Sequence, residues 1–373
     1  MSIKLPVMTA KPIIRITLHA LVVLALTACS RTSVMPGAMQ HPREGHAALL
    51  LQNGKIILLG GDDSHTAEIF DPDSRKWHLT QSPIDFGSCP SAFELANGSV
   101  LVVARGGYGT PPSPLTGAEL YDPATDQWTV TDSLSVPRSG HAAAHLSNGT
   151  VLVCGGFDPN SNSRLTSAEI YNPSTGKWTA TGAMNVARDN CFSAVLLTNK
   201  KVLVVGGEKT GTCELFDPAT GQWTLTGSLS NSNTGTVTLL RDHRVLSIGY
   251  QGLRAESPTA ELYNPATGIW ANEGPVPSGM VAARRNWSAT LLANGKVLVA
   301  GGENGGGFGG YPIAKMALFD PATGKWASAG SLHIARSDHS ATLLANGKVL
   351  ITGGDSDPEF QDKPLASVEL FSP

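Results

Sequence analysis

The sequence predicts an all-β protein built from seven copies of one four-stranded unit. The first observation is literal repetition, because SATLLANGKVL stands at Ser288–Leu298 and again at Ser340–Leu350. The second is a set of short signatures that recur with a period of roughly 50 residues. The third is composition: 41 glycines and 24 prolines among 373 residues, with 15% charged, suit short strands joined by many turns.

The first two strands of each unit are predicted to form a hairpin. An apolar stretch such as HAALLL, from His46, leads into a tight turn and then into a β-rich run such as KVLVVGG, which ends at a glycine pair. The dipeptide Asn-Gly accepts the positive φ angles of a two-residue hairpin turn. It occurs at Asn53, Asn97, Asn148, Asn294 and Asn346.

The third and fourth strands are predicted from a second pair of signatures. The third carries segments such as AEIFDP at Ala67, and a turn such as DPATG at Asp217 leads to a tryptophan on the fourth. The third strand is apolar on both faces, as expected for a sheet packed between two others, and blade-like sheets around an axis meet that need. The tryptophans are Trp77, Trp128, Trp178, Trp223, Trp270 and Trp326.

This pattern resembles the Kelch-repeat family of β-propellers. The resemblance is carried by the glycine pair, the aromatic-Asp/Asn-Pro of the third strand and the tryptophan of the fourth, and it covers nearly all of the chain after residue 28. It implies a ring of blades with four antiparallel strands each. Three copies depart from the pattern: Ala104-Arg105 and Gly249-Tyr250 replace glycine pairs, and Ala317 replaces the third-strand glutamate.

Ring closure is predicted from a mismatch between the strand counts. The third-strand signature occurs seven times, but only six fourth strands precede Pro373. PGAMQHPR at Pro36–Arg43 aligns with TGAMNVAR at Thr181–Arg188, which places Thr32–Met35 on a fourth strand with Ser33 at the tryptophan position. We expect this segment to complete the seventh blade, because an unclosed ring exposes a sheet edge. The alternative is an open blade of three strands.

The N-terminus is predicted to be a lipoprotein signal peptide over residues 1–28, with the propeller over residues 29–373. Three basic residues precede ITLHALVVLALTA, an apolar run shorter than the ~20 residues that span a bilayer. LTAC at Leu26–Cys29 resembles a bacterial lipobox, which implies lipid on Cys29 and an exported protein anchored to the cell envelope. By resemblance to Gram-negative sorting rules, Ser30 allows outer-membrane delivery. The alternative is an ordinary signal peptide.

An arginine recurs just before the first strand, and a histidine often follows it. One interpretation is a ring of cationic donors around the axial opening, suited to carboxylates or acidic sugars. The other is structural, with each arginine paired to a third-strand glutamate, and it is favoured because both partners repeat with the blade. The candidates are Arg43, Arg138, Arg188, Arg284, Arg336, His46, His141 and His339, with Trp287 in the histidine position of the sixth blade.

The long loops between the second and third strands are the predicted binding surface. These loops lie on the face opposite the Asn-Gly turns, and we expect this loop face to point away from the membrane. One of the loops, ENGGGFGGYPIAK, carries Phe308 and Tyr311. We expect a binding module for a protein or a glycan. The alternative is a carbohydrate-active enzyme with an axial site, of the galactose oxidase or sialic-acid mutarotase type. The mutarotase family has a ring of six blades, and the catalytic residues of neither family can be matched to positions of this sequence.

No cofactor, metal site or nucleic-acid partner is expected, and the chain is expected to be a monomer. The net charge of -3 gives no basic surface for nucleic acid. DSDPE at Asp355–Glu359 offers three carboxylates but lacks the glycine and the spacing of a calcium loop.

Four cysteines follow Cys29, and they allow three complete disulfide pairings. Cys191 and Cys213 fall on the first and third strands of one blade, about 9–10 Å apart, which exceeds the ~7 Å between Cα atoms that a disulfide spans. Cys154 and Cys213 occupy apolar positions and are predicted to be buried thiols. The redox state of Cys89, Cys154, Cys191 and Cys213 stays open.

Overall fold

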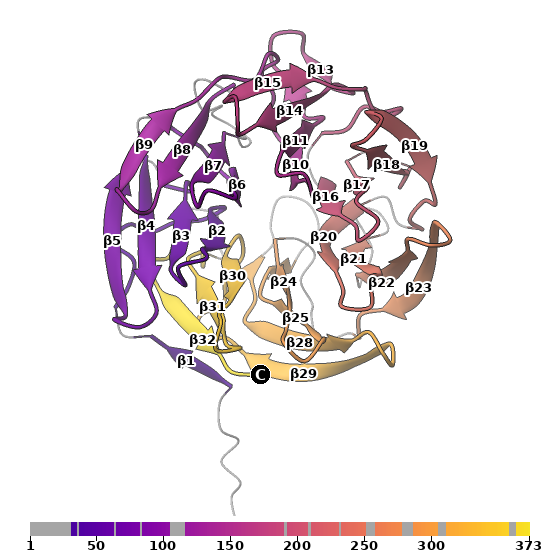
Figure 1. The fold of residues 1–373 in the computed structure, drawn as a ribbon. Coiled ribbons are helices and arrows are strands. Elements are labelled where there is room, and N and C mark those ends of the chain that lie inside the picture. Colours follow the sequence, from indigo (N-terminus) through magenta and orange to yellow (C-terminus); the bar gives the residue numbers. More distant parts are fainter. Residues whose placement is uncertain are drawn as a thin grey trace, which may run out of the picture. The chain divides into compact units, whose positions relative to one another are not determined.

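The computed structural model describes residues 31–35, 37–62, 65–82, 84–104, 116–189, 192–207, 210–230, 233–250, 258–277, 286–304, 311–357 and 363–373. The chain divides into two units, Met1–Ser30 and Arg31–Pro373, and the first lies outside the described residues. The described part of the second unit contains strands and no helix. Its strands form seven antiparallel sheets of four, as the sequence predicts (Figure 1).

Each sheet is one blade, and its strands follow each other in chain order except in the last. The blades are, in order, β2 (Ala47–Leu50), β3 (Ile56–Leu59), β4 (Thr66–Asp71) and β5 (Lys76–Gln81); β6 (Ser91–Glu94), β7 (Val100–Val103), β8 (Ala118–Asp122) and β9 (Gln127–Val130); β10 (Ala142–His145), β11 (Val151–Cys154), β14 (Ala168–Asn172) and β15 (Lys177–Ala180); β16 (Phe192–Leu196), β17 (Val202–Gly206), β18 (Cys213–Asp217) and β19 (Gln222–Thr226); β20 (Asn233–Leu239), β21 (Val245–Tyr250), β22 (Thr259–Asn264) and β23 (Ile269–Pro275); β24 (Ser288–Leu291), β25 (Val297–Ala300), β28 (Lys315–Asp320) and β29 (Lys325–Ser331); and β30 (Ser340–Leu343), β31 (Val349–Thr352), β32 (Val368–Phe371) and β1 (Thr32–Val34).

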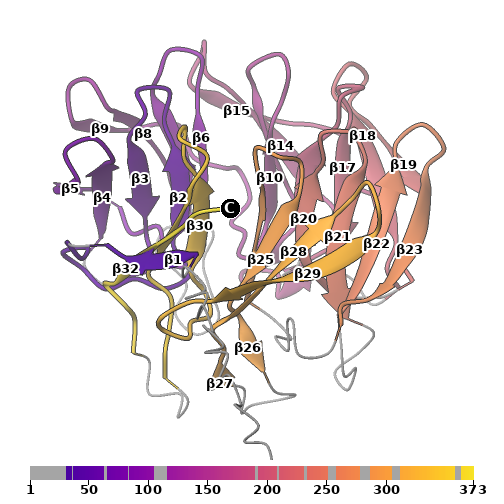
Figure 2. The same ribbon diagram turned by 90° about the horizontal axis from the view of Figure 1, so that it is seen from below.

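The seven first strands surround the axis and the fourth strands form the rim (Figure 1). Each first strand contacts the first strands of both neighbouring blades, which closes the inner circle. Seen from the side, the hairpin turns gather on one face, and the two-stranded sheet of β26 (Glu303–Asn304) and β27 (Tyr311–Pro312) projects from the other (Figure 2). A second small hairpin pairs β12 (Phe157–Asp158) with β13 (Ser163–Arg164).

The hydrophobic core is divided into seven clusters, and each fills the space between two neighbouring blades. Wherever their side chains are described, the second strands are buried; Val100, Leu101, Val102 and Val103 of β7 are typical. A strand buried on both faces needs apolar residues at every position, which explains why these runs do not alternate with polar residues.

The fourth-strand tryptophans join neighbouring blades. Each ring packs on the aromatic residue opposite it on the third strand, with centroids 4.8–5.1 Å apart in all six pairs. The indole N–H of Trp178 donates to the Asp132 carbonyl of the preceding blade at 3.0 Å, and that of Trp223 donates to Gly182 at 2.7 Å. Five of the six tryptophans thus add a hydrogen bond between blades to their packing, whereas Nε1 of Trp326 has no hydrogen-bond partner.

The seventh blade is closed by β1, as predicted, but the register differs by one residue. Phe371, the third-strand aromatic of this blade, faces Thr32, so Thr32 takes the tryptophan position and Ser33 does not. In blade 3, Gly182 follows Thr181 directly, whereas one extra residue stands between their counterparts Met35 and Gly37. The sequence alignment was off by one position because it had no gap for this residue. Thr32 is buried, and its hydroxyl donates to the Ser331 carbonyl of blade 6 at 2.9 Å. It makes the hydrogen bond that an indole makes elsewhere.

Replacing Thr32 with valine should lower the free energy of unfolding by about 1 kcal/mol. The side chains have similar shapes, so the change removes the hydrogen bond to Ser331 and leaves that carbonyl without its donor. Urea unfolding of Thr32→Val and of Ser33→Ala tests this, since Ser33 is exposed. A larger loss in Ser33→Ala than in Thr32→Val would contradict the observed register.

Candidate functional site

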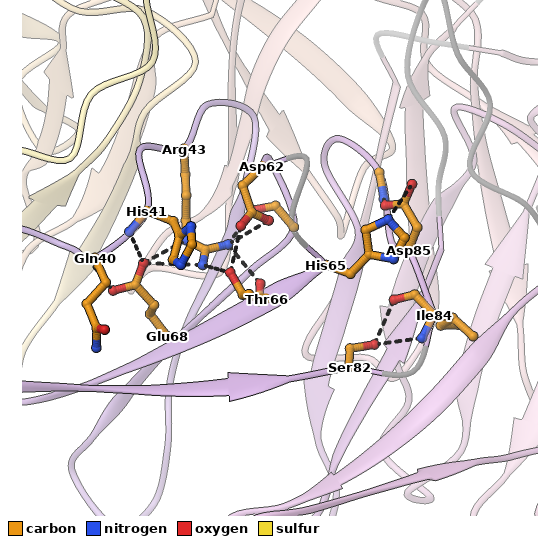
Figure 3. A network of polar contacts seen from close by, with 12 residues as sticks. Gln40, His41, Arg43, Asp62, His65, Thr66, Glu68, Ser82, Ile84 and Asp85 are labelled. Carbon is orange, nitrogen blue, oxygen red and sulfur yellow. Dashed lines mark hydrogen bonds and ion pairs between the residues drawn. The ribbon is translucent and has the colours of Figure 1, made fainter.

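The arginine of blade 1 is buried in a polar cluster beneath the loop face. Arg43 is 0% exposed, and its guanidinium lies 3.2 Å from Glu68 Oε1 and 3.1 Å from Asp62 Oδ1. It also donates to the carbonyls of Gly60, at 3.0 Å, and Thr66, at 2.8 Å. Figure 3 shows Glu68 accepting the backbone N–H groups of Gln40 and His41 on its other side. Every donor of the guanidinium therefore points at protein acceptors.

Three more blades repeat this arrangement. The distance from Nη2 of the arginine to Oε1 of the third-strand glutamate is 2.9 Å for Arg138 and Glu169, 3.0 Å for Arg188 and Glu214, and 3.0 Å for Arg336 and Glu369. All three arginines are 0% exposed. The structural pairing inferred from the repeat is confirmed for these four blades. A ligand in the axial opening would have to displace the glutamates from these ion pairs to reach the guanidinium groups. Ligand binding by the arginines stays a prediction. Arg284 lies outside the described residues.

The recurring histidines form hydrogen bonds to the preceding blade. Nε2 of His46 lies 2.9 Å from Thr352 Oγ1, that of His141 lies 3.2 Å from Ser91 Oγ, and that of His339 lies 2.8 Å from Ser288 Oγ. The indole of Trp287, in the same position, donates to Thr236 at 3.1 Å.

The environment of His46 and His339 favours the neutral ring. Burial, followed by the nearby Arg43, His339 and Arg336, lowers the pKa of His46 to about 3. Burial and Arg336 lower the pKa of His339 to about 3 as well. Both rings are therefore neutral at physiological pH and hold neighbouring blades together.

A polar cluster between blades 6 and 7 was not foreseen from the sequence. Asn286 donates through Nδ2 to Glu303 Oε1 at 3.0 Å and to Asp338 Oδ2 at 2.9 Å. Burial, with further contributions from Glu303 and Asp355, raises the pKa of Asp338 to about 6. Asn286 and Asp338 are 52 residues apart, the length of one repeat, so only the ring brings them together. Within the described ranges, no group of three His, Cys, Asp or Glu residues has the geometry of a metal site.

The loop face carries exposed side chains on the two small hairpins. Tyr311 of β27 is 52% exposed, and its hydroxyl lies 3.4 Å from Asn304 Nδ2. On the β12–β13 hairpin, Arg164 pairs with Asp189 at 2.9 Å while remaining 47% exposed. Phe308, the other candidate of the predicted binding loop, lies outside the described residues, as do Cys29 and Cys191.

The cysteines that the structure describes are not in disulfides. Cys154 and Cys213 are buried, as predicted, and the Cys213 thiol lies 3.6 Å from the Gly211 carbonyl. Burial raises the pKa of Cys154 to about 12, so this thiol is unreactive. Cys89 is exposed. Over the same residues, no helix is long and apolar enough to cross a membrane.

Comparisons with known proteins agree with the repeat assignment. The Kelch motif matches residues 137–185, which correspond to blade 3. Kelch-like protein 15 of Danio rerio is 30% identical over 142 residues, which cover 32% of this chain and 23% of the relative. An F-box/kelch-repeat protein of Arabidopsis thaliana is 32% identical over 134 residues, covering 33% of this chain and 32% of the relative. The matches thus span a third or less of these relatives, and they support a Kelch-repeat family.

Among solved structures, a fungal alcohol oxidase of the AA5 family, determined in complex with copper, has a similar fold. The TM-score is 0.72, the match covers 91% of this chain and 76% of the other, and 17% of the residues are identical. At this identity the likeness concerns the fold alone.

Proposed function

We propose that this protein is a binding module that engages a protein or a glycan through the loop face of its propeller. The observation that carries the proposal is the contrast between the two kinds of candidate residue. The arginines at the axis are buried in ion pairs within their own blades, whereas Tyr311 and Arg164 on the projecting hairpins are exposed. Exposed aromatic and arginine side chains are the ones that most often contribute binding energy at interfaces.

The Kelch-repeat assignment supports the same role. Kelch propellers generally mediate protein binding, and the match to the Kelch motif covers blade 3, from which the β12–β13 hairpin projects. The scaffold is rigid and the two hairpins differ in sequence, so they offer an asymmetric surface on a repeating frame.

Lipid attachment is part of the proposal. The LTAC sequence at Leu26–Cys29 supports lipid on Cys29 after removal of residues 1–28, and the anchored protein would lie on the cell envelope. β1 begins at Thr32, so only two residues separate Cys29 from the ring. Such a short connection, which reaches about 10 Å, would hold the propeller close to the bilayer. Labelling of the wild-type chain and of Cys29→Ala with a clickable fatty acid, followed by membrane fractionation, tests this part.

Residues 31–373, immobilised and probed with a glycan array and with fractionated envelope proteins, test the binding role. We expect Tyr311→Ala and Arg164→Ala each to weaken binding of the captured ligand about 5- to 30-fold, the range for interface residues worth 1–2 kcal/mol. Ile269→Ala, at a 62% exposed position on the rim strand β23, is the matched control and should bind as the wild type does. A ligand whose affinity falls only with the rim variant would contradict the proposed face.

A further inference from the structure

The face of the ring that carries the hairpin turns, which we call the turn face, differs in charge from the rest of the molecule (Figure 2). Together with Arg31, which stands just before β1, its turns carry 12 Lys and Arg residues and seven Asp residues. All other residues from position 31 onward carry 12 Lys and Arg against 23 Asp and Glu. The turn face is therefore positive although the ring as a whole is negative. Its turns are residues 52–55, 71–76, 96–99, 122–127, 147–150, 172–177, 198–201, 217–222, 241–244, 264–269, 293–296, 320–325 and 345–348.

Most of these basic side chains have no role that the fold itself explains. Four form ion pairs with aspartates 2.7–3.5 Å away, namely Lys177, Lys201, Arg244 and Lys296. Within the described part of the ring, no ion pair is formed by the other eight, Arg31, Lys55, Arg75, Lys76, Lys200, Arg241, Lys325 and Lys348.

The aspartates of the turn face differ from the lysines in this respect. Four of the seven accept the backbone N–H group two residues further on, and so hold their turns in shape: Asp71, Asp122, Asp217 and Asp320. The negative charges thus belong to the turn structure, whereas most of the positive charges are available to a partner.

The positive charge is densest in the sector of blades 6, 7 and 1. The acidic residues in the turns of this sector are Asp71, Asp73 and Asp320, and the more numerous basic residues are Arg31, Lys55, Arg75, Lys76, Lys296, Lys325 and Lys348. Blade 2 is the exception on this face, because its turns contain Asp122 and Asp126 and no basic residue. The turn face therefore has one strongly basic sector, centred on blade 7.

The chain enters the ring in the same sector and on the same face. Thr32 of β1 pairs with Phe371, which in turn pairs with Val349, the residue that follows the hairpin turn of blade 7. Arg31 therefore lies at the turn end of this blade and is exposed. Cys29, the candidate for lipid attachment, stands two residues before Arg31 in the sequence. The position of β1 and the distribution of charge are independent observations, and both assign the turn face to a membrane.

We propose that the turn face, centred on blades 6, 7 and 1, binds the surface of a bilayer that contains anionic phospholipids. The proposal rests on the envelope location given under the proposed function and adds a second contact to the lipid on Cys29. One acyl anchor combined with a basic patch binds a membrane more stably than either does alone. The contact also fixes the orientation of the ring, so that the loop face and its hairpins point away from the bilayer.

The charges are sufficient for such a contact. A Lys or Arg residue close to an anionic surface strengthens binding about fivefold. The acidic residues of the loop face do not cancel this effect, because strands of four residues or more, at about 3.3 Å per residue, separate the two faces. This separation exceeds the Debye length of about 10 Å at 0.1 M salt.

The turn face is suited to surface charge and not to one particular headgroup. A hollow of about 260 Å³ between the turns of blades 1 and 7 is lined by Lys55, but Asp71 and Asp73 line it as well. Two carboxylates beside one lysine are unfavourable for a single bound phosphate group. We therefore expect vesicles of equal charge to bind equally, whether the charge comes from phosphatidylglycerol or from phosphatidylserine.

Vesicle flotation of the unit Arg31–Pro373 tests the proposal. This unit contains all seven core clusters and lacks Cys29, so the result does not depend on lipid attachment. We expect the unit to bind vesicles with about 40% phosphatidylglycerol in phosphatidylcholine at about 0.1 M salt. Binding should be at least tenfold weaker to pure phosphatidylcholine, and also at about 0.5 M salt.

The variant Lys76→Gln/Lys325→Gln should weaken binding to the anionic vesicles at least tenfold, because it removes two charges worth about fivefold each. Both lysines are exposed and begin a fourth strand, opposite Asp71 and Asp320. Glutamine already stands at this position in blades 2 and 4, so the fold tolerates it. Lys315→Gln/Lys363→Gln is the matched control: it removes two exposed positive charges from the loop-face ends of blades 6 and 7 and should bind as the wild type does.

Each outcome decides the proposal. Loss of binding in the turn-face variant alone supports it. Absence of binding to anionic vesicles, equal binding to pure phosphatidylcholine, or the same effect in both double variants overturns it. If Cys29 is not labelled by fatty acid but the vesicles bind as expected, the lipid anchor is wrong and the basic surface stands.

Discussion

Acidification from pH 7 to pH 4.5 should cost the propeller about 5 kcal/mol of stability through His46 and His339 alone. Both rings have a pKa of about 3 in the folded protein and an ordinary value of 6.5 when unfolded. At pH 4.5 the unfolded chain has bound a proton at each ring and the folded protein has not. Each pH unit below 6.5 costs about 1.4 kcal/mol per ring. Since domains are commonly stable by only 5–15 kcal/mol, this loss is large.

The direction of the effect follows from linkage. The folded pKa lies below the unfolded one, so the unfolded state binds more protons between pH 3 and pH 6.5, and stability rises with pH across that window. Glu369 adds a loss in the same direction, because its pKa is lowered in the folded protein, but this loss appears only as the pH falls below the ordinary value of 4.5. Between pH 6 and pH 4.5, Asp338 and Glu119 act in the opposite direction, because burial raises the pKa of each to about 6 and the folded protein binds their protons first. The histidine contribution is therefore the difference between the wild type and a variant that lacks the two rings.

The double variant His46→Phe/His339→Phe removes the titrating groups at positions that accept other rings. The ring of Phe192, on blade 4, packs against Gly155 of blade 3. His46 packs against Gly353 and His339 against Gly301 in the same way, so an aromatic side chain fits this position. We expect the slope of unfolding free energy against pH, measured by urea denaturation, to flatten in the variant between pH 6.5 and pH 4.5. An unchanged slope would show that other groups cause the acid sensitivity.

Most of the fold could be predicted because its determinants are local. Asn-Gly and Pro-Ala-Thr-Gly turns set the strand boundaries within a few residues, and the glycine pair and tryptophan recur in step with them. The closing strand was found from an alignment of eight residues, but its register was not. A single extra residue near position 36 moves every side chain of a strand to the next position, and no local signal distinguishes Thr32 from Ser33.

The site was predictable only where it repeats. The Arg–Glu pairs follow from two residue types that recur with the same period, and the structure places them together in four blades. Asn286, Asp338 and Glu119 were missed because what distinguishes them depends on neighbouring blades or on an absent partner. Glu119 has the same third-strand context as its counterparts; the glycine at position 87, where four other blades have the arginine, and Ala104-Arg105 in place of a glycine pair are what distinguish its blade.

Replacing Arg336 with methionine should destabilise the protein by about 3–5 kcal/mol. The side chain is 0% exposed and donates to Gly353, Ser367 and Glu369. Methionine keeps much of the apolar volume, but it leaves Glu369 as a buried carboxylate without its cation, which is the costly way to break such a pair. Urea unfolding followed by tryptophan fluorescence measures the loss.

The comparison that decides the cause is the double variant Arg336→Met/Glu369→Gln. If the uncompensated charge dominates, removing it should recover at least half of the loss, because Gln is neutral and its one acceptor oxygen still serves one of the two N–H groups, of His333 and Ile334, that the carboxylate accepts. Arg244→Met is the matched control: it breaks the partly exposed pair with Asp242 and should cost under about 1 kcal/mol. Equal losses in Arg336→Met and Arg244→Met would mean that the buried pairs do not stabilise the ring.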